Sequence, residues 1–428
     1  MRNAGFGLVL SVLPYAAAAE GFATLKGHGG PIMDIAVNPR TDVVASASFD
    51  NSIGLWTETE PAWREGHDAA VVALLWLPDG RLVSGGDDFD IILWGDSPQR
   101  LEGHKGKVAS LALSPKADLI ASASWDGTIG LWPVGGGPPR FLEGHDGAVN
   151  DVAFSARGEL LSASADGTIR VWDIASGEGR VLLGNGFGIN RLAVDRAGKW
   201  LAFGAVDGAT RVVSLPDAAP LKDFSFDRRP ILAMDQSPSV PLLAVGDGHG
   251  YIMVIDTALW RIVHDFHATL RGPIWALSFS SDGDTLYAGG IEDIVYSWPV
   301  DGLQNYEPVD PAPRSFQLAP ETMGNGERQF QRKCSVCHDL SPGPSRRAGP
   351  SLYQLFGRPA GALPDYPYSD TLDAGDLIWT AETIDALFDL GPEHYIPGSK
   401  MPMQRITEQK DRDDLIEFLK TATAPQEN

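Results

Sequence analysis

The sequence predicts a multidomain protein in which an all-β propeller of seven blades precedes a second, smaller domain. The first observation is a repeat of about 40 residues that runs from residue 20 to residue 300. The second is a change to proline-rich sequence after residue 300, and the third is a pair of cysteines in the segment that follows. At 428 residues the chain is also longer than one ordinary domain.

Each repeat closes on a bulky apolar residue. Successive closing positions lie 38 to 43 residues apart, at Trp56, Trp94, Trp132, Trp172, Val213, Ile255 and Trp298. Short alternating apolar segments and Asp-containing turns lie between them. A period of this length, with such segments, is typical of four-stranded propeller blades. Seven closing positions therefore predict seven blades.

The first four repeats also share a polar pattern that begins with a Gly-His pair, which repeats five and six lack. In the fourth repeat, His145, Ser162, Asp166 and Trp172 are expected to form a buried hydrogen-bonded chain. A structural role is favoured over metal ligation or catalysis, because the same residue types recur in every regular repeat. In this pattern the sequence resembles WD-repeat propellers. The resemblance implies that residues 21–26 supply the outer strand of the last blade.

Two segments flank the propeller. Arg2, the apolar run 6–13 and the small residues 17–19 predict a cleavable signal peptide over residues 1–19, and hence a periplasmic protein. The alternative is a disordered start on a cytosolic protein. Four prolines within 301–320 predict a linker. The propeller is therefore expected over 20–300 and the second domain over 321–428.

The composition restricts the class of partner. Charged residues make up 21% of the chain and the formal net charge is −22. Nucleic acid and anionic membrane surfaces attract clustered Lys and Arg, so neither is expected as a partner. The apolar run near the start is too short for a permanent membrane anchor.

The only two cysteines of the chain stand in the motif Cys334-x-x-Cys337-His338. Two thiols at this spacing can each bond one vinyl group of a haem, while the following His reaches the iron. Zinc and a redox-active dithiol are the alternatives. A zinc site requires further ligands, and a thioredoxin-like dithiol requires a βαβ context that is absent here. One covalently attached haem c is therefore expected.

From Gly324 to about Thr421 the chain resembles class I cytochromes c of the mitochondrial type. The segments that carry the likeness are GNGERQFQRKCSVCH, AGPSLYQLFGRPAG, YPYSD, IWTAETI, YIPGSKM and DRDDLIEFLK. The resemblance implies an all-α cytochrome c fold in which His338 and Met401 ligate the iron. It also implies that the Pro350 carbonyl accepts a hydrogen bond from His338. Four further residues would hold the haem propionates: Arg358, Tyr368, Trp379 and Ser399.

Other residues qualify this resemblance. Met403 and His394 are rivals to Met401 as the sixth ligand. Phe388 replaces a Tyr that reaches the Met sulfur in the family. The family docks through a ring of lysines, whereas residues 316–428 carry a net charge of −6. Only a weak ring is expected here, from Arg332, Lys333, Arg346, Arg347 and Lys400.

The favoured hypothesis is an exported c-type cytochrome that carries single electrons, with the propeller as a docking platform for a redox partner. The donor and acceptor are not specified, and no catalytic residue is assigned. Because the propeller is acidic, a basic partner is favoured. The alternative is an oxidoreductase whose propeller holds a further cofactor or substrate, near Asp247, His249 and residues 227–229. A third hypothesis is a scaffold whose haem only reports redox state.

Overall fold

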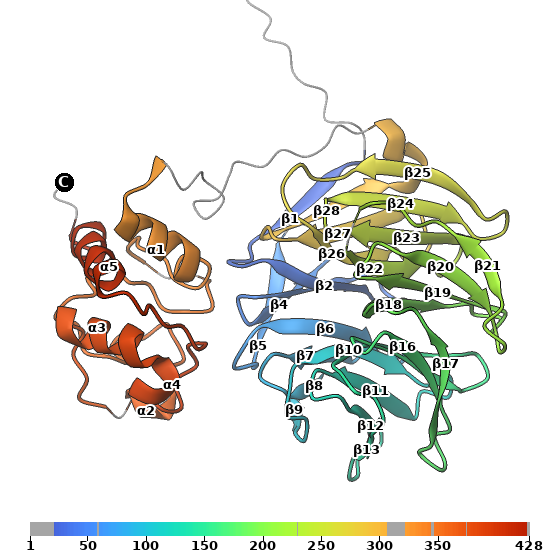
Figure 1. Ribbon diagram of the computed structural model, residues 1–428, viewed down its shortest axis with the longest axis horizontal. Coiled ribbons are helices and arrows are strands. Elements are labelled where there is room, and N and C mark those ends of the chain that lie inside the picture. Colours follow the sequence, from blue (N-terminus) through green and yellow to red (C-terminus); the bar gives the residue numbers. More distant parts are fainter. Residues whose placement is uncertain are drawn as a thin grey trace, which may run out of the picture.

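The computed structural model describes residues 21–57, 60–228, 230–305, 322–343, 346–373 and 375–425. The predicted signal peptide and most of the predicted linker lie outside these residues. A ring of β-sheets and a smaller helical domain lie side by side (Figure 1). Within the described ranges, no helix is both long enough and apolar enough to cross a membrane.

The ring consists of seven antiparallel sheets of four strands each, as the repeat predicts. Blade one contains β2 (Ile32–Val37), β3 (Val44–Ser48), β4 (Ser52–Trp56) and β5 (Pro61–Glu65). Blade two contains β6 (Val71–Trp76), β7 (Leu82–Gly86), β8 (Ile91–Trp94) and β9 (Gln99–Leu101). Blade three contains β10 (Val108–Leu113), β11 (Leu119–Ser124), β12 (Ile129–Pro133) and β13 (Arg140–Leu142).

The remaining four sheets follow in chain order. Blade four contains β14 (Val149–Phe154), β15 (Leu160–Ser164), β16 (Thr168–Trp172) and β17 (Gly179–Gly184). Blade five contains β18 (Ile189–Val194), β19 (Trp200–Ala205), β20 (Thr210–Ser214) and β21 (Pro220–Asp223). Blade six contains β22 (Ile231–Gln236), β23 (Leu242–Asp247), β24 (Tyr251–Asp256) and β25 (Arg261–His267). Blade seven contains β26 (Ile274–Phe279), β27 (Thr285–Gly290) and β28 (Ile294–Pro299), and its outer strand is β1 (Ala23–Lys26).

Pairing of β1 with β28 closes the ring, as the resemblance implied. Ala23 lies opposite Ser297 and Lys26 opposite Ile294. The two ends of the propeller therefore share one sheet, and neither end leaves an unpaired inner edge.

The closing residue of every repeat lies in the third strand of its blade. Trp172 is buried opposite Leu160, and the apolar substitutes Val213 and Ile255 are buried opposite Leu201 and Leu243. A buried apolar side chain is thus what the fold requires at this position, and blades five and six supply it without Trp.

The predicted hydrogen-bonded chain is present in all four regular blades. In blade four, His145 Nδ1 lies 2.7 Å from Asp166, His145 Nε2 lies 2.7 Å from the Ser162 hydroxyl, and Trp172 Nε1 donates to that hydroxyl over 2.8 Å. The same bonds join the equivalent residues of blades one to three. We call each such set a tetrad. Its members satisfy one another, which confirms the structural role predicted for them.

Three buried aspartates connect neighbouring blades. Asp34 accepts from Leu74 N over 2.7 Å, Asp151 from Leu192 N over 2.7 Å, and Asp235 from Phe279 N over 2.8 Å. Burial raises the pKa of Asp34 to about 6 and that of Asp235 to about 7.

The helical domain confirms the second predicted fold. It contains α1 (Asn325–Lys333), α2 (Asp370–Asp373), α3 (Ala381–Leu390), α4 (Pro392–Tyr395) and α5 (Gln409–Ala422), and the 3₁₀ helix η1 (Val300–Asn305) follows the propeller. Helix α3 begins with a capping box in which Thr380 and Thr383 exchange hydrogen bonds. Helices α1 and α5 cross closely, and the rings of Phe330 and Phe418 lie 5.6 Å apart.

Candidate functional site

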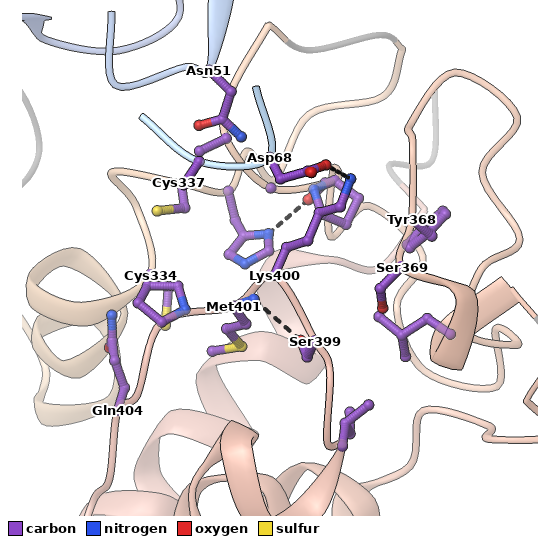
Figure 2. Close-up of a pocket in the computed structure, with 18 of the residues that line it drawn as sticks. Asn51, Asp68, Cys334, Cys337, Tyr368, Ser369, Ser399, Lys400, Met401 and Gln404 are labelled. Carbon is purple, nitrogen blue, oxygen red and sulfur yellow. Dashed lines mark hydrogen bonds and ion pairs between the residues drawn. The ribbon is translucent and has the colours of Figure 1, made fainter. Parts of the chain in front are cut away.

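A cavity of about 760 Å³ between the helical domain and the facing loops of the propeller is the candidate site. Its walls include all nine site residues predicted from the sequence, although they come from separate parts of the chain. They are Cys334, Cys337, His338, Pro350, Arg358, Tyr368, Trp379, Ser399 and Met401. Figure 2 shows the two cysteines and Met401 in the same space.

The Cys-x-x-Cys-His motif follows α1 as a compact turn. Cys337 N and His338 N both donate to the carbonyl of Cys334, over 3.0 and 2.9 Å. His338 Nδ1 lies 2.8 Å from the carbonyl oxygen of Pro350. Because a carbonyl oxygen only accepts, Nδ1 carries the proton and Nε2 keeps its lone pair. The ring is therefore prepared to bind a metal through Nε2.

Burial changes the protonation of these groups. It raises the pKa of Cys334 to about 12 and that of Cys337 to about 11, and it lowers the pKa of His338. The two cysteines form no disulfide bond with each other. A reactive dithiol requires a lowered thiol pKa, so this environment is unlike that of a redox-active Cys-x-x-Cys pair. A neutral imidazole, in contrast, is the form that ligates iron.

Met401 lies on the loop that follows α4. Its backbone N donates to the Ser399 hydroxyl over 3.1 Å, which fixes the chain just before the thioether. Of its two rivals, Met403 is 46% exposed and packs against Gly391, and His394 belongs to α4. Neither rival is among the residues that line the cavity.

The polar wall contains residues that the sequence analysis did not single out. Tyr366 donates to the carbonyl of Ala348 over 2.6 Å and lines the cavity beside Tyr368. Two other cavity residues, Ser369 and Gln404, each have a buried side-chain oxygen with no partner within the described part of the chain. Tyr366 and Ser369 belong to the same YPYSD segment as Tyr368, so that segment already held the signal.

Arg358 connects this wall to the backbone. Its Nη1 and Nη2 atoms donate to the carbonyls of Tyr353 and Ser351, each over 2.8 Å. Burial lowers the pKa of the guanidinium, although it keeps its charge at neutral pH. The structure thus places a positive charge beside the two tyrosines at the edge of the cavity.

The part of the wall that the helices supply is mostly apolar. Its members come from the core of the helical domain and include Leu355, Ile384, Leu387, Phe388, Ile396 and Leu419. A large apolar space with two thiols and a neutral imidazole, an oriented thioether and unpartnered polar atoms fits a haem.

Of the residues suspected of forming a second site, Arg229 lies outside the described residues, and Arg228 and Asp247 have structural partners. Arg228 lies 2.7 Å from Asp265 and 3.4 Å from Asp247, and it stacks over Tyr251. Asp247 also accepts from the backbone N atoms of His249 and Tyr251. Over the described residues, no group of three or more His, Cys, Asp or Glu side chains is arranged to hold a metal ion.

Comparisons with known proteins match both parts of the chain. The family described as WD domain, G-beta repeat matches residues 21–57, 62–95, 95–133, 136–173 and 260–298. The unmatched stretch contains blade five and the first three strands of blade six, the two blades that lack both the Gly-His pair and the closing Trp. The family described as Cytochrome c matches residues 324–423.

Individual relatives agree with the second match. Cytochrome c of Sesamum indicum is 39% identical over 110 residues, which are 25% of this chain and 96% of that protein. Cytochrome c of Gossypium barbadense is 40% identical over 113 residues, 26% of this chain and 99% of that protein. Cytochrome c of Theileria parva is 37% identical over 99 residues, 23% of this chain and 84% of that protein.

Proposed function

Because the chain belongs to the cytochrome c family through residues 324–423, we propose that it is an exported one-electron carrier with His338 and Met401 as its axial iron ligands. Family membership itself establishes one covalently bound haem c and electron transfer through it, and WD repeats indicate protein interaction. The proposal adds the ligand pair, the export and the use of the propeller to dock a redox partner.

The observation that carries the proposal is the cavity that brings Cys334, Cys337, His338 and Met401 together. When bound, haem c supplies an iron that alternates between two oxidation states and so passes one electron at a time. Pro350 holds the His338 ring in one orientation, and Ser399 fixes the backbone of Met401. A His/Met pair favours the reduced iron, which suits a carrier.

The other residues of the cavity would exclude water from the haem and hold its charged propionates. The apolar core residues around the site lower the local dielectric, which raises the cost of a net charge on the iron. Arg358 and Tyr368 line the polar edge of the cavity, where they would donate hydrogen bonds to the haem propionates and Arg358 would balance their negative charge. A wall with an apolar part around the iron and a polar edge for the propionates suits a haem that only gains and loses electrons.

Export is proposed on the sequence pattern of residues 1–19 and on the kind of cofactor. A basic start, an apolar run and small residues form a signal for secretion. The expected location is the periplasm, and the electron donor and acceptor are expected to be proteins found there.

The test is expression of the full chain in a bacterium that attaches haem to exported cytochromes. We expect intact-mass measurement of periplasmic protein to give the chain from Glu20 onward plus one haem. The reduced protein should have a sharp low-spin spectrum, and the oxidised protein a weak far-red band from the Met–iron bond. Protein that stays in the cytoplasm would contradict the export, and a high-spin spectrum would contradict the ligand pair.

Two variants separate the candidate sulfur ligands. Met401→Ala should remove the far-red band and produce a high-spin or ligand-exchanged spectrum. Met403→Ala is the matched control, because this side chain is exposed and outside the cavity, and it should keep the band. A band that survives Met401→Ala and disappears in Met403→Ala would reverse the assignment.

A further inference from the structure

The cavity of the helical domain opens toward the propeller. Part of its wall is formed by loops of blades one to three, which contribute Phe49, Asn51, Asp68, Phe89 and Trp125. Figure 2 shows Asn51 and Asp68 close to Cys337 and Lys400. Because Cys337 would bond one edge of the haem, the propeller faces the side of the cavity where that edge would lie.

Two cations of the helical domain contact the propeller directly. Arg346 Nη1 lies 2.7 Å from Glu65 Oε1, and its guanidinium lies 4.0 Å from the centre of the Trp63 ring. Lys400 Nζ lies 2.9 Å from Asp68 Oδ1. Both cations belong to the weak ring that the sequence suggested for docking an external partner. Here they bind acidic and aromatic groups of the same chain.

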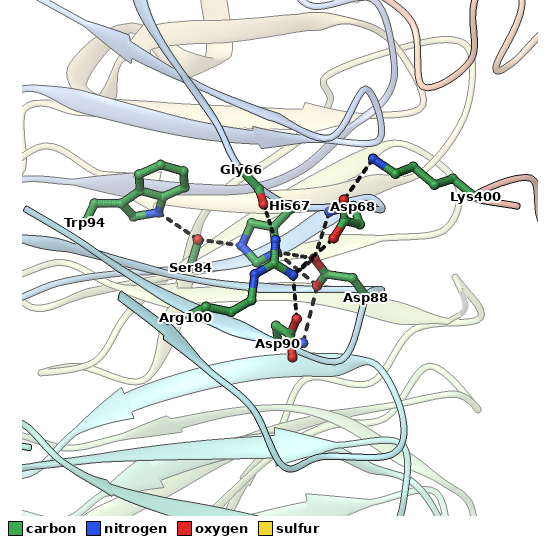
Figure 3. Close-up of polar contacts among 9 residues, drawn as sticks. All are labelled: Gly66, His67, Asp68, Ser84, Asp88, Asp90, Trp94, Arg100 and Lys400. Carbon is green, nitrogen blue, oxygen red and sulfur yellow. Dashed lines mark hydrogen bonds and ion pairs between the residues drawn. The ribbon is translucent and has the colours of Figure 1, made fainter. Parts of the chain in front are cut away.

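Contacts within the propeller hold two residues on its side of this contact, Trp63 and Asp68. Trp63 packs edge-on against His28, with ring centres 4.8 Å apart, and so rests on the tetrad of blade one. Asp68 Oδ2 lies 3.2 Å from Arg100, which also binds Asp90 over 2.5 Å (Figure 3). Because these groups are already oriented, little side-chain freedom remains to be lost when Arg346 and Lys400 arrive.

Gly29 gives independent evidence that this face is built to be covered. In each regular blade, the residue after the tetrad His donates its backbone N–H to the tetrad Asp. Blades two to four carry side chains at this position, namely Asp68, Lys105 and Asp146. The blade therefore tolerates a side chain here, yet blade one has glycine.

The reason for this glycine lies in the helical domain. A Cβ added at Gly29 would lie 1.5 Å from the carbonyl oxygen of Arg346, and its three nearest atoms all belong to the backbone of Arg346 and Arg347. Gly29 is not among the residues with a positive φ, so its own conformation does not demand glycine. The docked domain excludes a side chain at this position.

We infer that Gly29, Trp63, Glu65 and Asp68 form a docking surface for the cytochrome domain of the same chain, and that this contact shields the haem edge from protein partners until it is released. We call these four residues the docking face. Each ion pair is weak on its own and is screened by salt. Covalent connection of the two domains raises the effective concentration and favours the docked state. Only the shielding rests on the proposed electron-transfer function.

Carbodiimide cross-linking of the full haem-containing protein tests the docking. The carbodiimide adds to the Asp68 carboxyl group and gives an O-acylisourea. The Lys400 amine then attacks the acyl carbon and forms the amide, while the urea leaves with one former carboxylate oxygen and the proton lost by the amine. We expect an intrachain Asp68–Lys400 link in peptide mass spectra, with a yield that falls as salt is raised. Gly29→Ala should lower the yield at least tenfold.

The matched control is Asp146→Ala, which changes the same position in blade four. That position uses its backbone N–H in the same way, and the control should keep the yield within twofold. If Gly29→Ala does not fold, Glu65→Lys replaces it, because this side chain is 68% exposed and would repel Arg346. The inference would be overturned if the link is absent or forms only between two chains. Equal yields in the unchanged protein and in Gly29→Ala would also overturn it.

Stopped-flow oxidation tests the shielding. Neutral benzoquinone and an oxidised blue copper protein serve as a small and a large oxidant of the reduced haem. Gly29→Ala should raise the rate with the protein oxidant at least fivefold and change the rate with benzoquinone less than twofold. Equal changes with the two oxidants would overturn the shielding. Failure of haem attachment would contradict the proposed function instead, since it is visible before either experiment.

Discussion

The close crossing of α1 and α5 predicts a large effect of one methyl group. A Cβ at Gly326 would lie 1.9 Å from the Asp414 carbonyl oxygen and 2.8 Å from Phe418 Cβ. The carbonyl belongs to the helix backbone and cannot rotate away. Gly326→Ala therefore forces the two helices apart by about 1 Å or distorts one of them.

The expected magnitude follows from two opposing effects. Overpacking of this kind costs about 1–3 kcal/mol, and a clash with backbone lies at the upper end of that range. Alanine is the better helix former by about 1 kcal/mol, which offsets part of the cost. We expect a net loss of about 2 kcal/mol, and hence a Tm lower by about 10 °C for a domain of this size.

The assay is thermal unfolding followed by the visible absorption of the haem, which reports only on the helical domain. Gly324→Ala is the matched control, because its Cβ would meet nothing within 4 Å and its φ is −62°. The control should unfold within about 2 °C of the unchanged protein, since exposed substitutions have small effects. A Gly326→Ala protein that unfolds at the original temperature or above it would refute the close crossing.

The remaining predictions concern the tetrads and the Met401 loop. Trp172→Phe keeps an aromatic ring but removes the N–H that binds Ser162 and part of the buried indole, so the propeller should lose about 1–3 kcal/mol in urea unfolding followed by circular dichroism. The pKa of Asp166 is lowered from 3.8 to about 2, mainly by hydrogen bonds from Thr168 and His145 against the effect of burial. A lowered carboxylate pKa stabilises the fold above pH 3.8 and ceases to do so as the pH falls through 2. The stability difference between the protein and Asp166→Asn should therefore shrink between pH 4 and pH 2, and a constant difference would contradict the shift. Ser399→Ala removes the acceptor of Met401 N, so the far-red band should disappear at a temperature several degrees lower, consistent with a loss of about 1 kcal/mol.

The fold was predictable because its signals repeat. Seven closing residues at a regular spacing gave seven blades, and the His, Ser, Asp and Trp of the tetrads occur four times in the same order. Irregular blades were harder to interpret. Their sheets form without Trp because Val213 and Ile255 fill the same buried position. The partners of Arg228 in blade six had no counterpart elsewhere in the sequence that would have pointed to them.

Much of the candidate site could be located from the sequence because its motifs are short and occur in a fixed order, although Tyr366, Ser369 and Gln404 were missed. All nine predicted residues line one cavity. What the sequence did not reveal was the contact across domains. Arg346 and Glu65 are 281 positions apart, and nothing near either residue indicates the other. Gly29 was visible as an exception among four equivalent positions, but its cause lies in the backbone of another domain.

A potentiometric titration of the intact exported protein, followed by its visible spectrum, tests the central claim most directly. The account predicts a single reversible transition that involves one electron, with the far-red band present in the oxidised form. The account would be contradicted by a transition of two electrons or by a second chromophore that titrates separately. A haem that cannot be reversibly reduced would also contradict it.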